Sequence, residues 1–509
     1  MPAAPRPAPP AATDAVTSPL ADDQRERLVG PTERVAIVVL LLWLLVCAVM
    51  LSRHEMWRDE LQTWSIARDA SSPVDFIPVT RYAGHPPFWY LVLWIASRVS
   101  RQPMAMQLVN LAVMGAAAYL VLLRAPFRMR YRILVVFGYF PLFEYGVVSR
   151  SYGLAFLLIA SYLVSSSDGR RIVLPVTLLC LASNTTVVAI PLVFGLLCAW
   201  WVDSESALRR RRRSTQAIAI GSVVAGSAVA LALSRPPSDG VKVEAGNVDS
   251  PVADALRSVV RVMYPIPDNG PHFWNSYLTS SLGILEVILG ASLLVVLTWW
   301  FSTHRPALVV WLVGGCGYLV ATFTYGLPTF ARHLSMVWLA GLSACWIMQS
   351  SPLGRSTRGR VGSPVILTSL VVSVVAAAFS IGVDYARPFS GGEAVAGEIV
   401  AEEPGAPVVC VAIDVICSTV AVRLDQPAII GSTEFTYVVW KPLREAAMLP
   451  DDAFALASNI NASSGKPVAV IVPASEIPAW CTRRFVSPDP IVADEALAVC
   501  WVPSGNTGP

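Results

Sequence analysis

Long apolar runs recur along most of this chain, and they constrain its fold more than any other feature. Charged residues make up only 14% of the 509 residues and hydrophobic residues 54%, whereas a soluble protein carries roughly 25% charged residues. Runs of about 20 apolar residues match the thickness of a bilayer's hydrocarbon core. The sequence therefore predicts a mainly α, polytopic membrane protein with about 11 transmembrane helices, at residues 35–51, 104–123, 133–148, 152–166, 172–187, 188–202, 217–233, 278–301, 307–325, 334–348 and 364–383.

Arginine-rich linkers orient these spans, because positively charged loops stay in the cytoplasm. With a cytoplasmic N-terminus, all of these linkers fall inside, provided that segment 86–96 is an interfacial or re-entrant helix. If that segment crosses fully, every later cationic loop moves outside. Arginine also far outnumbers lysine, a bias typical of GC-rich bacteria, so we expect a multi-pass protein of a bacterial cell membrane. The linkers are residues 124–132, 168–171, 209–213, 304–305 and 354–360.

The orientation divides the chain into three parts. Residues 1–34 are rich in Pro and Ala and predict a disordered cytoplasmic tail. Residues 35–383 form the transmembrane domain, with a first outer loop at 52–103 and a long outer loop at 235–277. Residues 384–509 contain short β-branched runs around a helical segment, which predicts a small extracytoplasmic α/β domain.

Four of the nine cysteines lie in this C-terminal domain, at Cys410, Cys417, Cys481 and Cys500. In an oxidising compartment they predict two disulfides, with three possible connectivities. The other five lie in apolar runs and are expected to act as small hydrophobic residues. No metal-binding spacing is present, and Asp268 is too isolated to indicate a divalent cation. We therefore expect no metal and no cofactor; a divalent cation stays an alternative that no residue pattern supports.

Two adjacent acids, Asp59 and Glu60, follow the first span in the stretch "MWRDELQTW". Adjacent side chains on a helix point about 100° apart, so both cannot face one pocket. One can act in chemistry while the other holds a neighbouring cation. An interfacial location alone would also explain both acids, because charged residues are common there.

Cationic side chains are expected at three separate outer turns, although outer loops are usually depleted of positive charge. The turns are "RYAGHPP", "SRSYG" and "TFARH". Together they indicate an anionic ligand near the outer leaflet, such as a lipid phosphate. A helix-capping turn with an incidental histidine would also explain the first of them. The cationic side chains are Arg81, His85, Arg150, Arg332 and His333, and Tyr152 lies beside Arg150 at the second turn.

In these residues the sequence resembles the GT-C superfamily of lipid-linked-sugar glycosyltransferases, particularly protein O-mannosyltransferases and the aminoarabinose transferases of lipid A. The resemblance rests on "WRDE", "GHPPFWYLVL", "SRSYG" and the many-span layout with an outer C-terminal domain. It covers roughly residues 35–350 as architecture, with motif-level likeness in the first hundred or so. It implies transfer of a sugar, possibly mannose or a pentose, from a polyprenyl-phosphate donor to a hydroxyl of a glycan, lipid or secreted protein.

The resemblance also implies roles for individual residues. Asp59 would be the general base, and His85, Arg150 and Arg332 would hold the donor phosphate, with Arg58, Arg81, Tyr152 and His333 beside them. Glu60, grouped with Asp59 as catalytic, would orient a cation or the acceptor hydroxyl. Several relatives have lysine at the position of His85, so phosphate contact there would depend on pH.

Four further residues have two readings each. Trp57 and Trp64 would stack on sugar rings or belong to an interfacial aromatic belt. His272 and Trp274 would line the acceptor path or lie in a solvated loop.

Two other functions remain open. A lipid-linked-sugar transporter would place charges at mid-membrane and show internal repeats, and neither is evident in the sequence. A non-catalytic scaffold for cell-envelope assembly would keep the same binding pocket. Nucleic acid is excluded as a partner, because the net charge is only +3 and no basic stripe is present.

Overall fold

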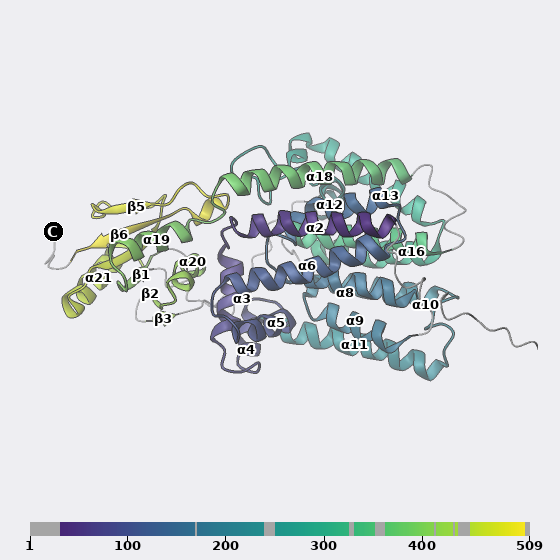
Figure 1. The fold of residues 1–509 in the computed structure, drawn as a ribbon, viewed down its shortest axis with the longest axis horizontal. Helices are drawn as coiled ribbons and strands as arrows, with labels where there is room; N and C mark the ends of the chain where they lie inside the picture. Colours follow the sequence, from purple (N-terminus) through teal and green to yellow (C-terminus); the bar gives the residue numbers. More distant parts are fainter. Residues whose placement is uncertain are drawn as a thin grey trace, which may run out of the picture.

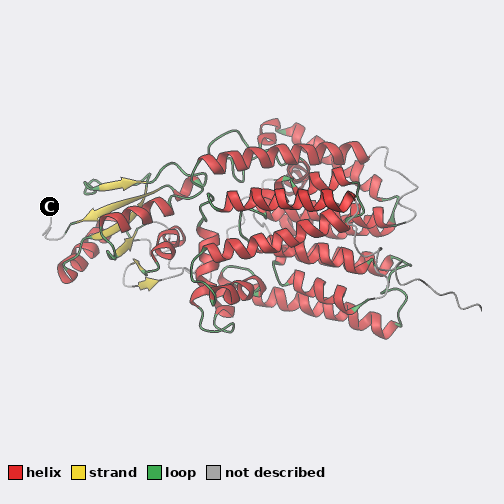
Figure 2. Cartoon of the chain, viewed as in Figure 1, coloured by secondary structure: helices red, strands yellow, loops and turns green. Residues whose placement is uncertain are grey.

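The computed structural model describes residues 31–167, 171–238, 250–324, 330–351, 362–411, 414–430, 433–435 and 448–503. Figure 1 shows a bundle of long helices with a smaller unit at one end. In Figure 2 the strands of the described chain lie in that smaller unit. The predicted mainly α architecture with a small C-terminal α/β unit is confirmed. Of the predicted tail, residues 1–34, the first 30 lie outside the described residues. Residues 31–34 are helical.

Within the described ranges, six helical segments are long and apolar enough to cross a membrane. Each coincides with a run predicted as a span. The last of them, α18, leads directly into the C-terminal unit at one end of the bundle (Figure 1). The segments are α2 (Pro31–Leu51), α6 (Met104–Arg124), α11 (Arg213–Ser234), α13 (Ile284–Phe301), the continuous α14 (Arg305–Val309), η4 (Val310–Cys316) and α15 (Gly317–Thr324), and α18 (Gly362–Ala386).

The other five predicted spans are shorter, interrupted or less apolar. Residues 133–148 divide into α7 (Met129–Val136) and the π-helical turn η1 (Tyr139–Glu144). The remaining four correspond to α8 (Ser151–Ser166), α9 (Val173–Ser183), η2 (Val187–Ala189) with α10 (Ile190–Val202), and α16 (Ala331–Ser350).

The outer surface of the bundle is apolar. On α2, Val38, Leu41 and Leu45 expose 60% or more of their area, while Trp43 and Cys47 on the opposite side are buried in the core. A soluble protein rarely exposes a contiguous apolar face of this kind. Contact of this face with lipid is the natural explanation.

Residues 52–103, predicted as the first outer loop, contain three short helices, α3 (Arg58–Asp69), α4 (Phe76–Tyr82) and α5 (Phe88–Ser97). Ten residues of α5 extend about 15 Å, half of the roughly 30 Å needed to cross. The long loop at 235–277 contains α12 (Pro251–Met263), which was not predicted. The run 278–301, predicted as a span, begins with the short turn η3 (Leu278–Leu282) before α13. Arg261 of α12 is paired with Glu286 of α13 at 3.0 Å.

The C-terminal unit contains a six-stranded mixed sheet in the order β3-β2-β1-β4-β6-β5. Helices α19 and α20 cover one face and α21 the other, because alternate strand residues belong to two separate clusters. The helical segment predicted between the β-branched runs is α21. The elements are α19 (Gly392–Glu402), β1 (Val408–Cys410), α20 (Asp414–Leu424), β2 (Ala428–Ile430), β3 (Thr433–Phe435), α21 (Pro450–Ser464), β4 (Val468–Pro473), β5 (Arg484–Val486), η6 (Ala493–Glu495) and β6 (Leu497–Val502).

Two disulfides select one of the three connectivities that the sequence allows. Cys410 is joined to Cys417, and Cys481 to Cys500. The five cysteines of the helical part are free, as expected for small apolar side chains.

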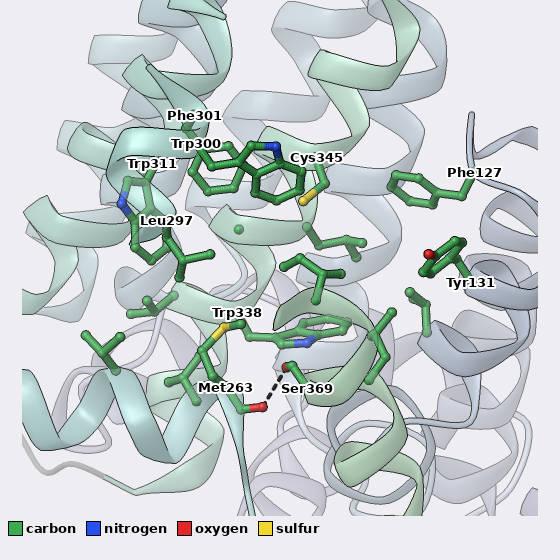
Figure 3. A pocket seen from close by; sticks show the side chains of 18 of the residues that line it. Phe127, Tyr131, Met263, Leu297, Trp300, Phe301, Trp311, Trp338, Cys345 and Ser369 are labelled. Atoms are coloured by element: carbon green, nitrogen blue, oxygen red, sulfur yellow. Dashed lines mark hydrogen bonds between the residues drawn. The ribbon is translucent and has the colours of Figure 1, made fainter. Parts of the chain in front are cut away.

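An apolar cavity of about 160 Å³ lies within the helical bundle (Figure 3). Trp300, Trp311 and Trp338 enclose it together with aliphatic side chains, and Ser369 Oγ donates to the main-chain oxygen of Met263 at 2.6 Å. It shares no lining residue with the polar cavity described next.

Candidate functional site

A cavity of about 810 Å³ lies between the helical bundle and the C-terminal unit. Its wall combines α3, the turn before α5, the N-terminal ends of α8 and α16, residues 272–275 and the C-terminal segment 491–494. Ten of the thirteen residues predicted for the site line it: Trp57, Arg58, Asp59, His85, Arg150, Tyr152, His272, Trp274, Arg332 and His333.

Asp59 lies at the centre of the charged residues in this cavity. Its Oδ2 atom is 3.6 Å from Arg150 Nη1 and 3.5 Å from Arg332 Nη2. Arg150 Nη1 also donates to the main-chain oxygen of Asp59 at 2.6 Å. Burial alone would raise the pKa of Asp59, but the charges of Arg150, Arg332 and Arg58 outweigh it and hold the pKa below its usual value. Asp59 is therefore ionised at neutral pH.

Helix ends place the two arginines. Arg150 is the N-cap residue of α8, and Arg332 lies in the first turn of α16. The N-terminus of a helix carries a partial positive charge and free N–H groups, so it attracts anions. The two guanidinium groups that meet at the Asp59 carboxylate are therefore each carried by the N-terminal end of a helix.

Arg332 is held in an aromatic cage. Its guanidinium carbon is 5.1 Å from the ring centroid of Trp57, 5.3 Å from that of Trp274 and 4.4 Å from that of Phe330. The two indoles pack edge to face at 4.5 Å, and Glu144 accepts a hydrogen bond from Trp274 Nε1 at 3.0 Å. Cation–π contacts fix the plane of the guanidinium while leaving its N–H groups available.

His85 differs from the cation expected from the sequence. Arg150 Nη2 lies 3.3 Å from His85 Nε2, and because a guanidinium can only donate, Nε2 must accept. The proton is therefore on Nδ1. Burial, and then the charge of Arg150, lower the pKa of His85 to about 3. The imidazole is neutral, and pH near neutrality would not change its charge.

Glu60 faces away from the cavity, as the 100° step between adjacent helical residues predicts. Its Oε1 accepts the main-chain N–H of Ser149 at 2.6 Å. Its Oε2 accepts the N–H of Trp57 at 3.3 Å, which caps the start of α3, and lies 3.2 Å from His54 Nε2. The neighbouring cation that it holds is thus His54, which the sequence analysis did not select.

Arg58 binds two acidic residues of the C-terminal unit. Its Nη1 atom is 2.6 Å from Asp494 Oδ2, and its main-chain N–H donates to Glu495 Oε1 at 3.1 Å. Arg81 and Trp64 lie outside the cavity lining. Arg81 Nε donates to the main-chain oxygen of Arg235, and Trp64 is buried with Nε1 donating to Arg101.

The remaining predicted residues lie on the cavity wall. His333 packs on the rings of Tyr152 and Phe330 at 5.9 and 5.7 Å. His272 donates through Nδ1 to the main-chain oxygen of Pro490 at 3.0 Å. This contact joins the long loop at 235–277 to the C-terminal unit.

Sequence reasoning missed the C-terminal part of the wall. Ile491, Val492, Ala493 and Asp494 line the cavity, but their stretch carries no recognisable motif. The acidic pair at 494–495 is the only signal that could have suggested a partner for Arg58. Thr63, Tyr90 and Thr186 were also missed, because hydroxyl side chains on helices are common and uninformative.

Within the described residues, no group of three or more His, Cys, Asp or Glu side chains has a geometry that could hold a metal ion. Asp268 is not among the cavity-lining residues.

Comparison with known proteins gives one structural relationship. No protein-family model and no curated protein matches the chain. The fold is similar to the crystal structure of ArnT from Cupriavidus metallidurans bound to undecaprenyl phosphate, with 15% identity and a TM-score of 0.48 over 94% of this chain and 98% of that chain. For ArnT in the apo state the identity is 14% and the TM-score 0.49, over 93% and 98% of the chains. ArnT is a lipid A aminoarabinose transferase, one of the classes that the sequence resembles.

Proposed function

We propose that the protein is a membrane glycosyltransferase that moves a sugar from a polyprenyl-phosphate donor to an acceptor hydroxyl at this cavity. The observation that carries the proposal is a set of buried hydrogen-bond donors that lack partners. They belong to residues that line the same cavity as the ionised carboxylate of Asp59, at the end of a helical bundle whose exposed apolar surface suits lipid.

The unpartnered donors belong to five residues of the cavity wall. Among the described residues, no partner exists for Trp57 Nε1, His85 Nδ1, Tyr152 Oη, Thr186 Oγ1, or Nε and Nη1 of Arg332. Buried polar groups are normally satisfied, so a group of them calls for an explanation. All six atoms can donate a hydrogen bond, and together with the positive charge they suit a ligand rich in anionic oxygen atoms. A phosphate is the simplest such ligand.

The proposed reaction needs a base and an anion site, and no general acid. Asp59 takes the proton of the acceptor hydroxyl as its oxygen attacks the anomeric carbon of the donor. The bond between that carbon and the phosphate oxygen breaks, and its electron pair leaves with the phosphate. Arg150, Arg332 and Tyr152 stabilise the charge that develops on this leaving group. The products are the glycosylated acceptor, the polyprenyl phosphate and one proton on Asp59.

The donor phosphate would also prepare the base. Asp59 shares its two arginines with the proposed phosphate site, so bound phosphate draws part of their positive charge away from the carboxylate. The pKa of Asp59 would then rise toward its usual value, which makes it a stronger base when the donor is bound. Asp59 would then become an effective base for the acceptor hydroxyl only after the donor has bound.

The test is sugar transfer by purified protein in detergent, with a panel of polyprenyl-phosphate sugars and hydroxyl acceptors. Asp59→Asn should lower the rate by about 10²–10⁴-fold while donor binding persists. The matched control is Asp69→Asn at the other end of α3, because Asp69 pairs with Arg68 and Arg101 away from the cavity. If the wild type binds donor but transfers or hydrolyses nothing, the protein is a transporter or a scaffold instead.

A further inference from the structure

His54 occupies a fully buried position between two carboxylates. Its Nδ1 atom is 2.9 Å from Asp384 Oδ2, and its Nε2 atom is 3.2 Å from Glu60 Oε2. All three side chains have no exposed area. His54 belongs to the turn after α2, Glu60 to α3 and Asp384 to the end of α18, so this contact joins three elements. Both ring nitrogens face carboxylate oxygens, and this arrangement suits an imidazolium that donates twice.

One branch of this cluster leads to Arg150. The carboxylate of Glu60 that contacts His54 through Oε2 accepts the N–H of Ser149 through Oε1 at 2.6 Å. Ser149 directly precedes Arg150, whose side chain binds Asp59. The position of His54 therefore affects the main chain that carries the first arginine.

A second branch leads to Arg332 through aromatic rings. The His54 ring packs edge to face on Phe389 at 4.7 Å, and Phe389 packs on Trp274 at 5.1 Å. Trp274 forms one wall of the cage around the Arg332 guanidinium. The two arginines that meet at Asp59 are thus both connected to His54, one by hydrogen bonds and one by packing.

We infer that His54 is a positioning residue, which fixes Arg150 and Arg332 relative to Asp59 from its place between Glu60 and Asp384. The inference rests on the proposed function for its effect on turnover. It assigns the end of the last long helix, α18, a direct influence on the geometry of the base and the anion site.

The charge of His54, as well as its shape, carries this role. A neutral side chain at position 54 would leave Glu60 and Asp384 as uncompensated buried carboxylates. Glu60 would then take up a proton or turn, and the charge-assisted hydrogen bond to Ser149 would weaken. Misplacement of a catalytic group by about 1 Å can lower a rate by roughly 10²-fold.

The experiment compares His54→Gln, Asp384→Asn and the double variant with the wild type, all as full-length protein in detergent. Rates are expressed per folded molecule, which removes losses due to misfolding alone. His54→Gln should lower kcat by about 10- to 100-fold, with a smaller change in KM for the donor. The double variant should be no worse than His54→Gln, because removing both charges relieves the imbalance. His304→Gln is the control, since His304 lines a different cavity.

A second measurement does not depend on catalysis. Hydrogen exchange of the Ser149 amide should be faster in His54→Gln than in the wild type, while exchange in α9 stays unchanged. Unchanged protection of Ser149, or a kcat per folded molecule equal to that of the wild type, would overturn the inference. If the wild type transfers no sugar, the proposed function fails, and the Ser149 exchange still decides whether His54 positions this segment.

Discussion

Arg150 holds Asp59 at two points, since its Nη1 atom donates to the main-chain oxygen at 2.6 Å and lies 3.6 Å from the carboxylate. The main-chain contact fixes the start of α3 against the start of α8. The carboxylate contact is longer and weaker, so the phosphate of the proposed donor would compete for the same guanidinium. The site therefore combines a rigid frame with a replaceable ion pair.

Because donor phosphate would weaken the ion pair between Arg150 and Asp59, we expect the activity of the free and the donor-bound protein to depend differently on pH. The pKa of free Asp59 lies below its usual value of 3.8, so the carboxylate stays ionised and kcat/KM for the donor should stay level as pH falls to about 4. In the donor complex the pKa rises, so kcat should begin to fall at a higher pH. Initial rates across pH measure kcat and kcat/KM. If both fall at the same acidic pH, Asp59 does not share its two arginines with the donor phosphate. Preincubation at each pH, followed by assay at neutral pH, separates ionisation from unfolding.

The two arginines should not tolerate lysine. Lysine keeps the charge but lacks the planar fork that allows Arg150 to hold two atoms and Arg332 to stack in its cage. Arg150→Lys and Arg332→Lys should each lower kcat by about 10²–10³-fold. Arg101→Lys, at an exposed position, is the control and should keep the wild-type rate. Full activity in Arg332→Lys would show that the cage is not required.

His85 should act as a hydrogen-bond acceptor, and glutamine tests this. In His85→Gln the side-chain oxygen can accept from Arg150, so the loss of activity should be modest, less than about tenfold. His85→Leu leaves a buried guanidinium N–H without its partner and should cost more, on the order of 1–3 kcal/mol of transition-state stabilisation. Measured kcat/KM values give the comparison. If both variants lose activity equally, the imidazole acts as a cation on phosphate, as the sequence alone suggests.

The sequence predicted the meeting of Asp59, Arg150 and Arg332 because topology alone places their three turns at the same end of the bundle. It also predicted that Asp59 and Glu60 diverge, which follows from helix geometry. The state of His85 could not be predicted, since it depends on burial and on the direction of one arginine side chain. The ion pair of Arg58 could not be predicted either, because its partner Asp494 lies 436 residues later in the sequence.

Fold-level prediction failed where periodicity was weak or interrupted. Helix α12 has apolar and charged faces and too little hydrophobicity to signal a span. Residues 133–148 are apolar except for Glu144, yet a short helix and a π turn replace the single predicted span, with Gly138 and Pro141 at and after the break. The edge strands β3 and β5 have three residues each, too few for an alternation pattern to appear.

The His54 cluster predicts a stability that decreases at alkaline pH. Burial disfavours a charged imidazole, but Asp384 and Glu60 outweigh burial and raise the pKa of His54 from 6.5 to about 10. A raised pKa means that the folded protein holds a proton that the unfolded chain releases near pH 6.5. The resulting stability is fully present below pH 6.5 and is lost as pH rises through about 10. It amounts to on the order of 5 kcal/mol at most.

Melting temperatures of the wild type and His54→Gln from pH 6 to about 10.5 measure this contribution. The wild type should melt well above the variant near pH 6, and the gap should narrow steadily toward pH 10. Glu55, whose pKa burial raises to about 7, titrates in the same window and is affected by the charge of His54, so both proteins are also compared in a Glu55→Gln background. A gap that stays constant with pH would mean that His54 is neutral, and that its two carboxylate neighbours share a proton instead.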